Sequence, residues 1–186
     1  MNKQAILTTE RLLLKGITPA LIHELYNSKS KEEIMNYFEF DEAGYENFKN
    51  KHEKGMETDQ LSLFFFLLVD KSTNKTIGDC GFHTWNRKHR RAEVFYMMRN
   101  EEYKQKGLMT EAVAAVLEYG FTVLELHRVE ALVADWNTPS IKLLQRYGFT
   151  KEGTMREDYF FDGKNVSSEC YSLLKWEWEG IKINKS

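Results

Sequence analysis

The residues with the clearest chemical potential lie in the run KQKGLMTEA, from Lys104 to Ala112. Two lysines and one glycine stand directly before a segment with helical spacing, whose first N–H groups have no partner within the helix and lie at its positive end. An anion there gains backbone hydrogen bonds, charge-assisted contacts from Lys104 and Lys106, and a close approach at Gly107, which has no Cβ. The pattern predicts an anion site; solvated lysines before a helix are the alternative.

The other short motifs are weaker. A nucleotide-binding phosphate loop needs G-x-x-x-x-G-K-[ST], and here only Gly107 is present. Cys80 and Cys170 belong to no C-x-x-C pair, and no pair of histidines has the spacing of metal ligands. We therefore expect buried structural thiols in a reducing compartment and no metal.

A long amphipathic helix must position the turn. Apolar residues from Met109 to Leu124 recur with helical spacing, so one apolar face runs along a helix that begins at about Leu108. Glu111 and Glu118 are expected on its solvent side. The run AEVFYMMR, residues 92–99, has the composition of a strand and leads into the turn.

The rest of the chain reads as strands and helices joined by short loops. The other predicted strands are residues 11–17, 61–69, 76–85 and 129–133, and two in 149–178 with Asp162-Gly163 as their hairpin turn. The other predicted helices are one from Pro19 to Tyr26 capped by Thr18, one over 42–56, and one opened by Asn137 and ended by Gly148. The order β-α-α-β-β-β-α-β-α-β-β predicts an α+β domain with helices packed on a mostly antiparallel sheet.

Composition and net charge limit the kinds of partner that we expect. With 186 residues, of which 42% are hydrophobic, the chain is expected to form a single domain over residues 1–186. A net charge of -2 gives no global basic field, so neither nucleic acid nor an acidic membrane surface is an expected partner. The longest apolar run, Leu61 to Val69, is too short to span a bilayer, and the first residues have no secretory pattern. We expect a cytoplasmic protein.

Several segments in their order resemble the GNAT acetyltransferases, and more narrowly the RimJ/RimL-like branch that acetylates ribosomal-protein N-termini. The matching pieces are Thr9-Glu10-Arg11-Leu12, the run from Gly107 to Ala112, Asn137-x-x-Ser140-Ile141, Gly148-Phe149, Arg156 and the run from Cys170 to Leu174. The resemblance covers nearly the whole chain. It implies the GNAT fold, a mixed, mostly antiparallel twisted sheet of about seven strands with helices on both faces.

The same resemblance implies that the anion is the pyrophosphate of acetyl-CoA. Main-chain N–H groups would hold it, and the end of the preceding strand would line a channel for the pantetheine arm. The implied cofactor-binding residues are Met97, Met98, Arg99, Lys104, Gln105, Lys106, Gly107, Leu108, Met109, Thr110, Asn137 and Arg146. The turn departs from the family pattern: Lys104 replaces an arginine or glutamine, Gln105 stands at a frequent glycine position, and Met109 takes a small-residue position.

Two residues are candidates for the chemistry of acetyl transfer. Glu93, in an otherwise apolar strand, matches the glutamate that serves as base in some GNAT enzymes; a glutamate on the wet edge of a strand is the alternative. Ser140 is, by analogy with the branch, the proton donor to the CoA sulfur. Many GNAT enzymes use a tyrosine at the position that Leu144 occupies here, and Tyr147 lies on another face of its helix.

The sequence leaves several amines open as the acetyl acceptor. The resemblance favours the α-amino group of a protein N-terminus, with a polyamine or antibiotic amine as alternatives in the same class. A strongly acidic pocket would favour polycations, and an open groove would favour a peptide. A protein that binds acyl-CoA without turnover is the alternative from another class, because the turn is poor in glycine. We expect a monomer or homodimer.

Overall fold

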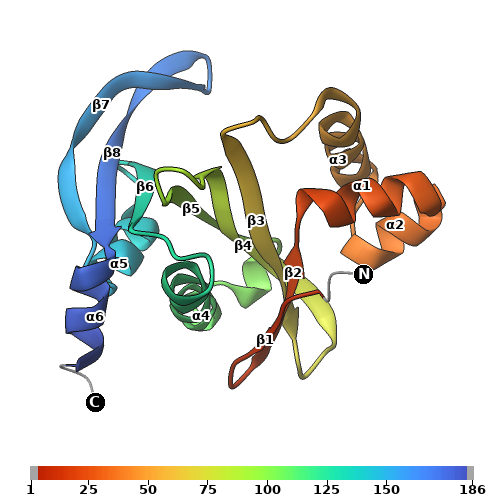
Figure 1. Cartoon of the computed structure of the whole chain (residues 1–186), viewed down its shortest axis with the longest axis horizontal. Helices are drawn as coiled ribbons and strands as arrows, with labels where there is room; N and C mark the ends of the chain where they lie inside the picture. The colour runs from red at the N-terminus through yellow and green to blue at the C-terminus, as the bar shows by residue number, and fades with distance from the viewer. Residues whose placement is uncertain (1–3, 184–186) are drawn as a thin grey trace.

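A single sheet forms the frame of the molecule, for which the computed structural model describes residues 4–183. Eight strands follow one another in the order β1-β2-β3-β4-β5-β6-β8-β7 (Figure 1). Their bounds are β1 (Ile6–Thr8), β2 (Leu12–Ile17), β3 (Leu61–Asp70), β4 (Lys75–Asn86), β5 (Arg91–Met98), β6 (Arg128–Ala134), β7 (Thr150–Phe161) and β8 (Lys164–Leu174). Every neighbouring pair is antiparallel except β5–β6, which is parallel. The expected mixed, mostly antiparallel sheet is confirmed, with one strand more than predicted, β1.

Helices cover both faces of this sheet, as predicted. They are α1 (Pro19–Ser28), α2 (Lys31–Phe38), α3 (Glu42–Lys54), α4 (Leu108–Thr122), α5 (Thr138–Arg146) and α6 (Lys175–Ile183), with a 3₁₀ turn at Glu101–Tyr103. Among residues 4–183, no helix is long and apolar enough to cross a membrane. Figure 1 shows α1, α2 and α3 gathered beside the β2–β4 part of the sheet, and the β7–β8 hairpin extending away from it as a curved ribbon.

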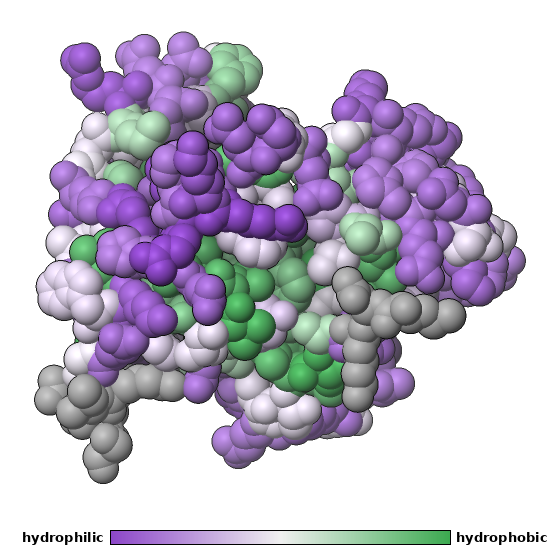
Figure 2. Space-filling view, viewed as in Figure 1, coloured by the Kyte–Doolittle hydropathy of each residue, from purple (hydrophilic) through white to green (hydrophobic). Residues whose placement is uncertain are grey.

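Alternation along β3 divides the core into two layers. Phe64, Phe66 and Leu68 join the cluster that includes the apolar face of α4, whereas Phe65 and Leu67 join the cluster built from α1 and α2. Figure 2 shows hydrophilic residues over the outer surface of α1–α3 and hydrophobic residues reaching the surface in the middle of the same view. Two helical layers on one sheet therefore bury both of its faces.

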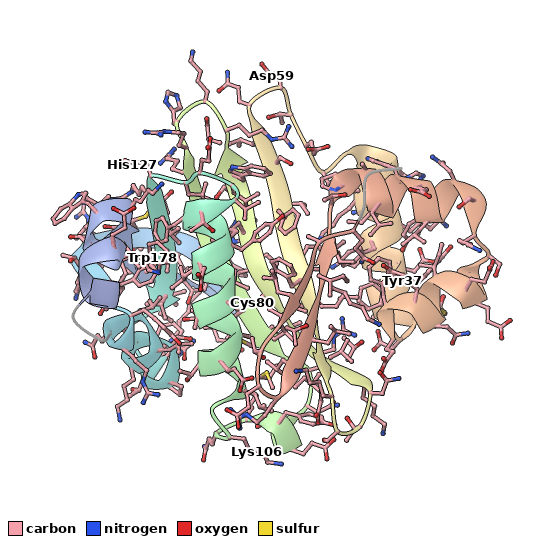
Figure 3. The ribbon with its side chains drawn as sticks, turned by 60° about the horizontal axis from the view of Figure 1, so that its bottom comes forward. Tyr37, Asp59, Cys80, Lys106, His127 and Trp178 are labelled. Atoms are coloured by element: carbon pink, nitrogen blue, oxygen red, sulfur yellow. The ribbon has the colours of Figure 1, made fainter. Side chains whose placement is uncertain are left out.

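Helix α4 lies close against the centre of the sheet. A Cβ at Gly120 would come within 2.5 Å of the Phe82 ring, so only glycine allows this approach. Figure 3 shows α4 running between Lys106 and His127 with Cys80 of β4 behind it. The predicted start at Leu108 is confirmed, and so is the apolar face, through residues such as Val113 and Leu117.

Three sequence predictions need correction. Helix α2 was not predicted, although Ser30 and Glu33 form a capping box at its start. The predicted last strand does not reach Trp178, because the chain becomes helical at Lys175. Glu111 is not on the solvent side of α4: its side chain is 16% exposed and is held by residues near the N-terminus.

Candidate active site

The turn before α4 presents a row of free amides. Gln105 and Gly107 have left-handed backbone conformations, with φ of 59° and 77°. Within residues 4–183 the N–H groups of residues 105–110 have no hydrogen-bond acceptor, whereas the next amide, Glu111, donates to Gly107 O at 3.0 Å. Alternating backbone handedness of this kind turns successive N–H groups toward one point, and the helix dipole adds to their positive potential. The geometry fits an anion.

A brace from the N-terminal segment holds this turn in place. The Arg11 side chain donates through Nε to Glu111 Oε2 at 2.7 Å and through NH1 to Lys106 O at 2.8 Å. Thr9 Oγ1 and the Arg11 amide donate to the other oxygen of Glu111, at 2.6 and 2.7 Å. The carboxyl is only slightly exposed, and these partners lower its pKa against the opposing effect of burial. Thus the Thr9–Arg11 segment fixes both the turn and the first turn of α4.

The side chains of Lys104 and Lys106, the two lysines of the turn, contact residues close to them in sequence. Lys104 forms an ion pair with Glu101, and the Lys106 ammonium lies 5.9 Å from the centre of the Tyr103 ring. Both lysines are exposed, as is Arg146 in the last turn of α5. The Arg11 NH2 group lies 3.5 Å from where a Cβ at Gly107 would be, so Arg11 adds a positive charge that sequence reasoning did not assign.

Strands β5 and β6 pair along only part of their length and separate beyond Glu93. Their parallel pairing covers only Arg91 to Glu93 of β5, opposite Arg128 to Glu130 of β6. Beyond Glu93 the two strands line a cavity of about 580 Å³, which we call the β5–β6 opening. It is lined by, among others, Glu93, Tyr96, Leu132, Trp136, Asn137, Ser140, Leu144 and Asp158. The opening therefore brings together Glu93, Asn137 and Ser140, three residues expected at one site.

The backbone of β5 offers hydrogen-bonding groups to this opening. Arg99 N donates to Ile77 O of β4 at 2.9 Å, and the β4–β5 register is regular from Glu93 to Met98. Successive residues of a strand direct their N–H and C=O groups to opposite neighbours. Those of Met98 and Tyr96 therefore point away from β4, while those of Met97 are used in pairing with β4. Tyr96 lines the opening, whereas Met97 and Met98 line a second cavity on the α3 side of the sheet. Of the two methionines expected here, Met98 has the free backbone groups.

Glu93 is placed where a carboxyl group can act as a base. Its side chain is 19% exposed, and burial raises its pKa from 4.5 to about 7, helped by the negative charges of Glu130 and Asp158 and opposed by a hydrogen bond from the Leu132 amide. His83 Nδ1 lies 3.6 Å from Glu93 Oε2. Burial, with the charge of Lys51, lowers the pKa of His83, so the imidazole is neutral at pH 7. A carboxyl group with a pKa near 7 can gain and release a proton at ordinary pH.

Two hydroxyl groups face each other across the opening. Asn137 caps α5 by accepting from the Ser140 amide at 3.3 Å, which fixes the first turn of this helix. Burial raises the pKa of Tyr96, and a side-chain hydrogen bond with Ser140 partly offsets the rise. Tyr96 was not singled out from the sequence as a proton donor. Leu144, where a tyrosine was considered, is buried and lines the same opening.

A second cavity reaches the same point from the α3 side of the sheet. This α3 cleft has a volume of about 1150 Å³ and is lined by α3, by the α2–α3 connection and by one face of β3–β5. His83 and Phe95 line both this cleft and the β5–β6 opening. The two cavities therefore meet beside Glu93, on opposite sides of β5.

Arg99 has a structural role in the floor of the α3 cleft. Its guanidinium binds both carboxylate oxygens of Asp79, at 3.0 and 3.3 Å, and donates to the carbonyls of Phe38 and Glu39 at 2.6 and 3.2 Å. The end of α2 is thereby tied to β4 and β5. With these bonds formed, the Arg99 side chain has little capacity left for a ligand; its backbone remains at the end of β5.

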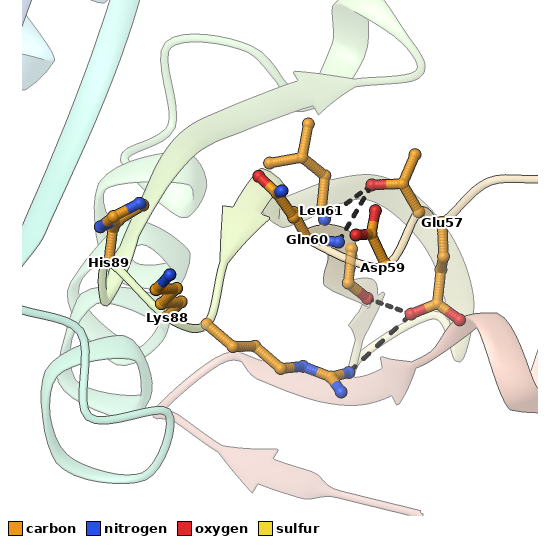
Figure 4. A pocket seen from close by; sticks show the side chains of 9 residues that line it. Glu57, Asp59, Gln60, Leu61, Lys88 and His89 are labelled. Atoms are coloured by element: carbon orange, nitrogen blue, oxygen red, sulfur yellow. Dashed lines mark hydrogen bonds and ion pairs between the residues drawn. The ribbon is translucent and has the colours of Figure 1, made fainter.

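A third, polar pocket of about 480 Å³ lies elsewhere, between the start of β3 and the β4–β5 turn (Figure 4). In it Arg87 approaches Glu57 at 3.8 Å, and Ser62 also binds Glu57. Its residue Asp59 and the turn residue Lys106 lie at opposite ends of the molecule (Figure 3). It shares no lining residue with the β5–β6 opening, and of its charged side chains Glu57 and Arg87 pair with each other. The pocket is therefore not part of the site around Glu93.

The two cysteines lie apart from this chemistry as free thiols. Cys80 is fully buried in β4, and burial raises its pKa, so it is not ionised at neutral pH. Cys170 is half-buried in β8, and its pKa is also raised, chiefly by burial.

The arrangement is chemically specific. The free amides before α4 form an anion site, and the opening between β5 and β6 holds a carboxyl group of raised pKa and two hydroxyls. A separate cleft approaches the same carboxyl group. Such a site can hold a phosphate-bearing acyl donor on one side and a nucleophile on the other, with a base between them.

Comparison with known proteins agrees with this geometry. The model of the acetyltransferase (GNAT) domain family matches residues 11–150. The N-acetyltransferase YoaA of Bacillus subtilis is 31% identical over 180 residues, 91% of this chain and 97% of that protein. The N-acetyltransferase p20 of Bacillus licheniformis is 41% identical over 115 residues, 62% of this chain and 64% of that protein, so the match spans less than two thirds of p20.

Solved structures share the fold at lower identity. The spermidine/spermine N-acetyltransferase SpeG of Vibrio cholerae matches with a TM-score of 0.70 and 20% identity, over 94% of this chain and 99% of its own. The ribosomal-protein-S5-alanine acetyltransferase of Vibrio fischeri matches with a TM-score of 0.67 and 21% identity, over 94% and 98%. The predicted superfamily is confirmed: the chain belongs to the GNAT family of acetyltransferases and is an N-acetyltransferase.

Proposed function

We propose that this acetyltransferase moves the acetyl group of acetyl-CoA to the α-amino group of a protein or peptide N-terminus, in the manner of the RimJ/RimL-like branch. The observation that carries the proposal is the junction beside Glu93 of the β5–β6 opening with a wide cleft. The cleft has mixed charge and an apolar floor, which suits a peptide better than a polycation.

Acetyl-CoA fits the residues on the anion side. Its pyrophosphate would lie against the amides of residues 105–110, beside Arg11, Lys104 and Lys106, and its pantetheine arm would occupy the β5–β6 opening. The free amides and the separation of the strands support this placement. Met98 would bind the pantetheine or the thioester oxygen through its backbone, and Asn137 would lie on the opposite wall. Arg146 would reach a phosphate from the exposed end of α5.

Of the acceptors considered, an α-amino group costs less free energy to deprotonate than a lysine amine. Its pKa of about 7.7 to 8 leaves it partly neutral at pH 7, at a cost of at most ~1.4 kcal/mol, whereas a lysine amine near 10.4 costs roughly 4.6 kcal/mol to deprotonate. A carboxyl group with a pKa of about 7 matches the first task. Glu93 would accept the proton directly or through one water molecule, with the neutral His83 beside it.

The remaining steps use groups already in place. The neutral amine attacks the thioester carbonyl, and a backbone N–H near Met98 would stabilise the oxygen as it becomes negative. When the C–S bond breaks, the thiolate takes a proton from the hydroxyl pair of Ser140 and Tyr96. Because the raised pKa of Tyr96 keeps it protonated at neutral pH, it is a proton donor rather than a base.

A thiol-release assay tests the proposal. Purified protein with acetyl-CoA is offered N-terminal peptides, spermidine and an aminoglycoside, and released CoA thiol is measured. We expect the highest kcat/KM with peptides. A preference for spermidine would replace the acceptor with a polyamine. Binding of acetyl-CoA without thiol release from any amine would instead identify a binding module.

A further inference from the structure

Most acidic side chains that line the α3 cleft are already hydrogen-bonded or ion-paired within the protein. Asp79 is buried and paired with Arg99 through both of its oxygens. Glu39 accepts from the amide and the hydroxyl of Thr76, at 3.0 and 2.9 Å. Asp41 caps α3 by accepting from the Gly44 amide at 2.8 Å. Of the four acidic side chains that line the cleft, only Glu102 has no such contact within residues 4–183.

The basic side chains divide differently. Arg99 is held by Asp79 and by two carbonyls. Lys51 lines the cleft from α3, and its ammonium lies 4.7 Å from the centre of the Phe48 ring. No carboxylate of residues 4–183 lies within ion-pair distance of Lys51 or of Lys75, the other lysine of the cleft. Lys51 and Lys75 are therefore the cations of the cleft without a carboxylate partner within residues 4–183, while Glu39 and Asp41, whose partners are neutral, keep their negative charges.

Lys51 also acts on the catalytic end of the cleft. Its own pKa is lowered because part of the side chain is withdrawn from water, and Asp79 only partly offsets this. Its charge also helps to lower the pKa of His83, the residue beside Glu93. The Lys51 ammonium is partly desolvated, has no carboxylate partner within residues 4–183, and acts electrostatically on His83 beside Glu93. Such a group is suited to binding an anion.

We infer that Lys51 forms a subsite for a carboxylate on the acceptor, so that the preferred substrates are peptides with an acidic residue close to the N-terminus. The same ammonium repels a second cationic group, which disfavours polyamines. This inference rests on the proposed function and names the substrate class for the same site. The aromatic floor of the cleft, from Phe40, Phe48 and Phe65, contacts the rest of the peptide.

Three peptides that differ only in charge test the inference. They begin with the same serine and continue with two glutamates, two glutamines or two lysines; spermidine and free glutamate are the further acceptors. Each is assayed with wild-type protein, Lys51→Gln, Lys51→Glu and the control Lys49→Gln. Lys49 is on the same helix but faces Glu46 at 3.9 Å and does not line the cleft.

We expect wild-type protein to prefer the acidic peptide over the neutral one by roughly three- to tenfold in kcat/KM, the range of a partly exposed charge pair. Lys51→Gln should abolish the preference and Lys51→Glu should reverse it, with the KM for acetyl-CoA unchanged; Lys49→Gln should behave as wild type. If free glutamate is acetylated better than the acidic peptide, the subsite binds an α-carboxylate. The inference that peptides are the substrate class would then be overturned.

Failure of this inference is distinct from failure of the proposed function. Acetylation of the three peptides at equal rates, or a preference that persists in Lys51→Gln, would overturn the Lys51 subsite while leaving peptide acetylation intact. If thiol is released only with spermidine, or if none of the amines causes release, both the Lys51 subsite and the proposed function are overturned. Thermal unfolding of each variant shows that it is folded.

Discussion

Replacing Glu93 with glutamine should make the protein more stable and less active, and the gain in stability should depend on pH. The carboxyl group has an ordinary pKa of 4.5 when exposed and about 7 in the folded protein. Folding therefore favours its protonated form, and the stability present below pH 4.5 is lost as the pH rises through 7. One pKa unit corresponds to about 1.4 kcal/mol, so the loss amounts to roughly 3 kcal/mol at most.

Glutamine keeps the size of the side chain and is neutral at every pH. The free energy of unfolding of Glu93→Gln should equal that of wild type below about pH 4.5 and exceed it by up to roughly 3 kcal/mol at pH 8. Urea unfolding of both proteins between pH 4.5 and 8 measures the difference. Curves that stay parallel over this range would refute the argument, because Glu93 would then titrate at its ordinary value.

The same variant tests the catalytic role. The kcat/KM of wild type should rise with pH as Glu93 ionises near pH 7, and the variant should lose this limb and roughly a hundredfold or more in kcat. The dissociation constant of acetyl-CoA should be nearly unchanged, since Glu93 lies at the end of the opening away from the turn. Unaltered kinetics would remove Glu93 from the mechanism.

Three further changes probe the rest of the site. Gly107→Val should weaken CoA binding by about tenfold or more, because a branched side chain at φ 77° costs roughly 1–2 kcal/mol; calorimetry showing wild-type affinity would contradict the assigned turn. Arg11→Ala should raise the KM for acetyl-CoA roughly five- to tenfold but leave that for S-acetyl-pantetheine, which lacks the diphosphate, unchanged; an equal rise for both would deny its place at the phosphates. Tyr96→Phe with Ser140→Ala should lower kcat about tenfold or more and leave KM values alone, and full activity would exclude this pair as the proton donor.

The fold could be predicted where local patterns and tertiary structure agree. Thr18 and Pro19 start α1, Asn137 caps α5, and Asp162-Gly163 forms the β7–β8 turn, all as expected. Helix α2 was missed because only Ile34 and Phe38 of its eight residues are buried, which leaves a weak periodic pattern. Helix α6 was missed because the apolar run continues from β8 into Trp176 without a turn residue.

The site was harder to derive than the fold because its contacts join distant segments. Glu111 looked like a solvent-facing helix residue, yet its partners Thr9 and Arg11 are about a hundred residues away in sequence. Tyr96 alternates with Phe95 in an apolar strand, and only the separation of β5 from β6 gives its hydroxyl a neighbour on α5. Likewise Arg99 could not be seen to bind Asp79 before the β4–β5 register was known.

The central claim is that the amides of residues 105–110 bind the diphosphate of CoA and that the pantetheine arm enters the β5–β6 opening. A crystal structure with CoA measures this directly. We expect phosphate oxygens within about 3 Å of several of these amide nitrogens and the sulfur beside Ser140 and Tyr96. CoA bound in the α3 cleft, or a β5–β6 opening left empty beside bound CoA, would contradict the claim.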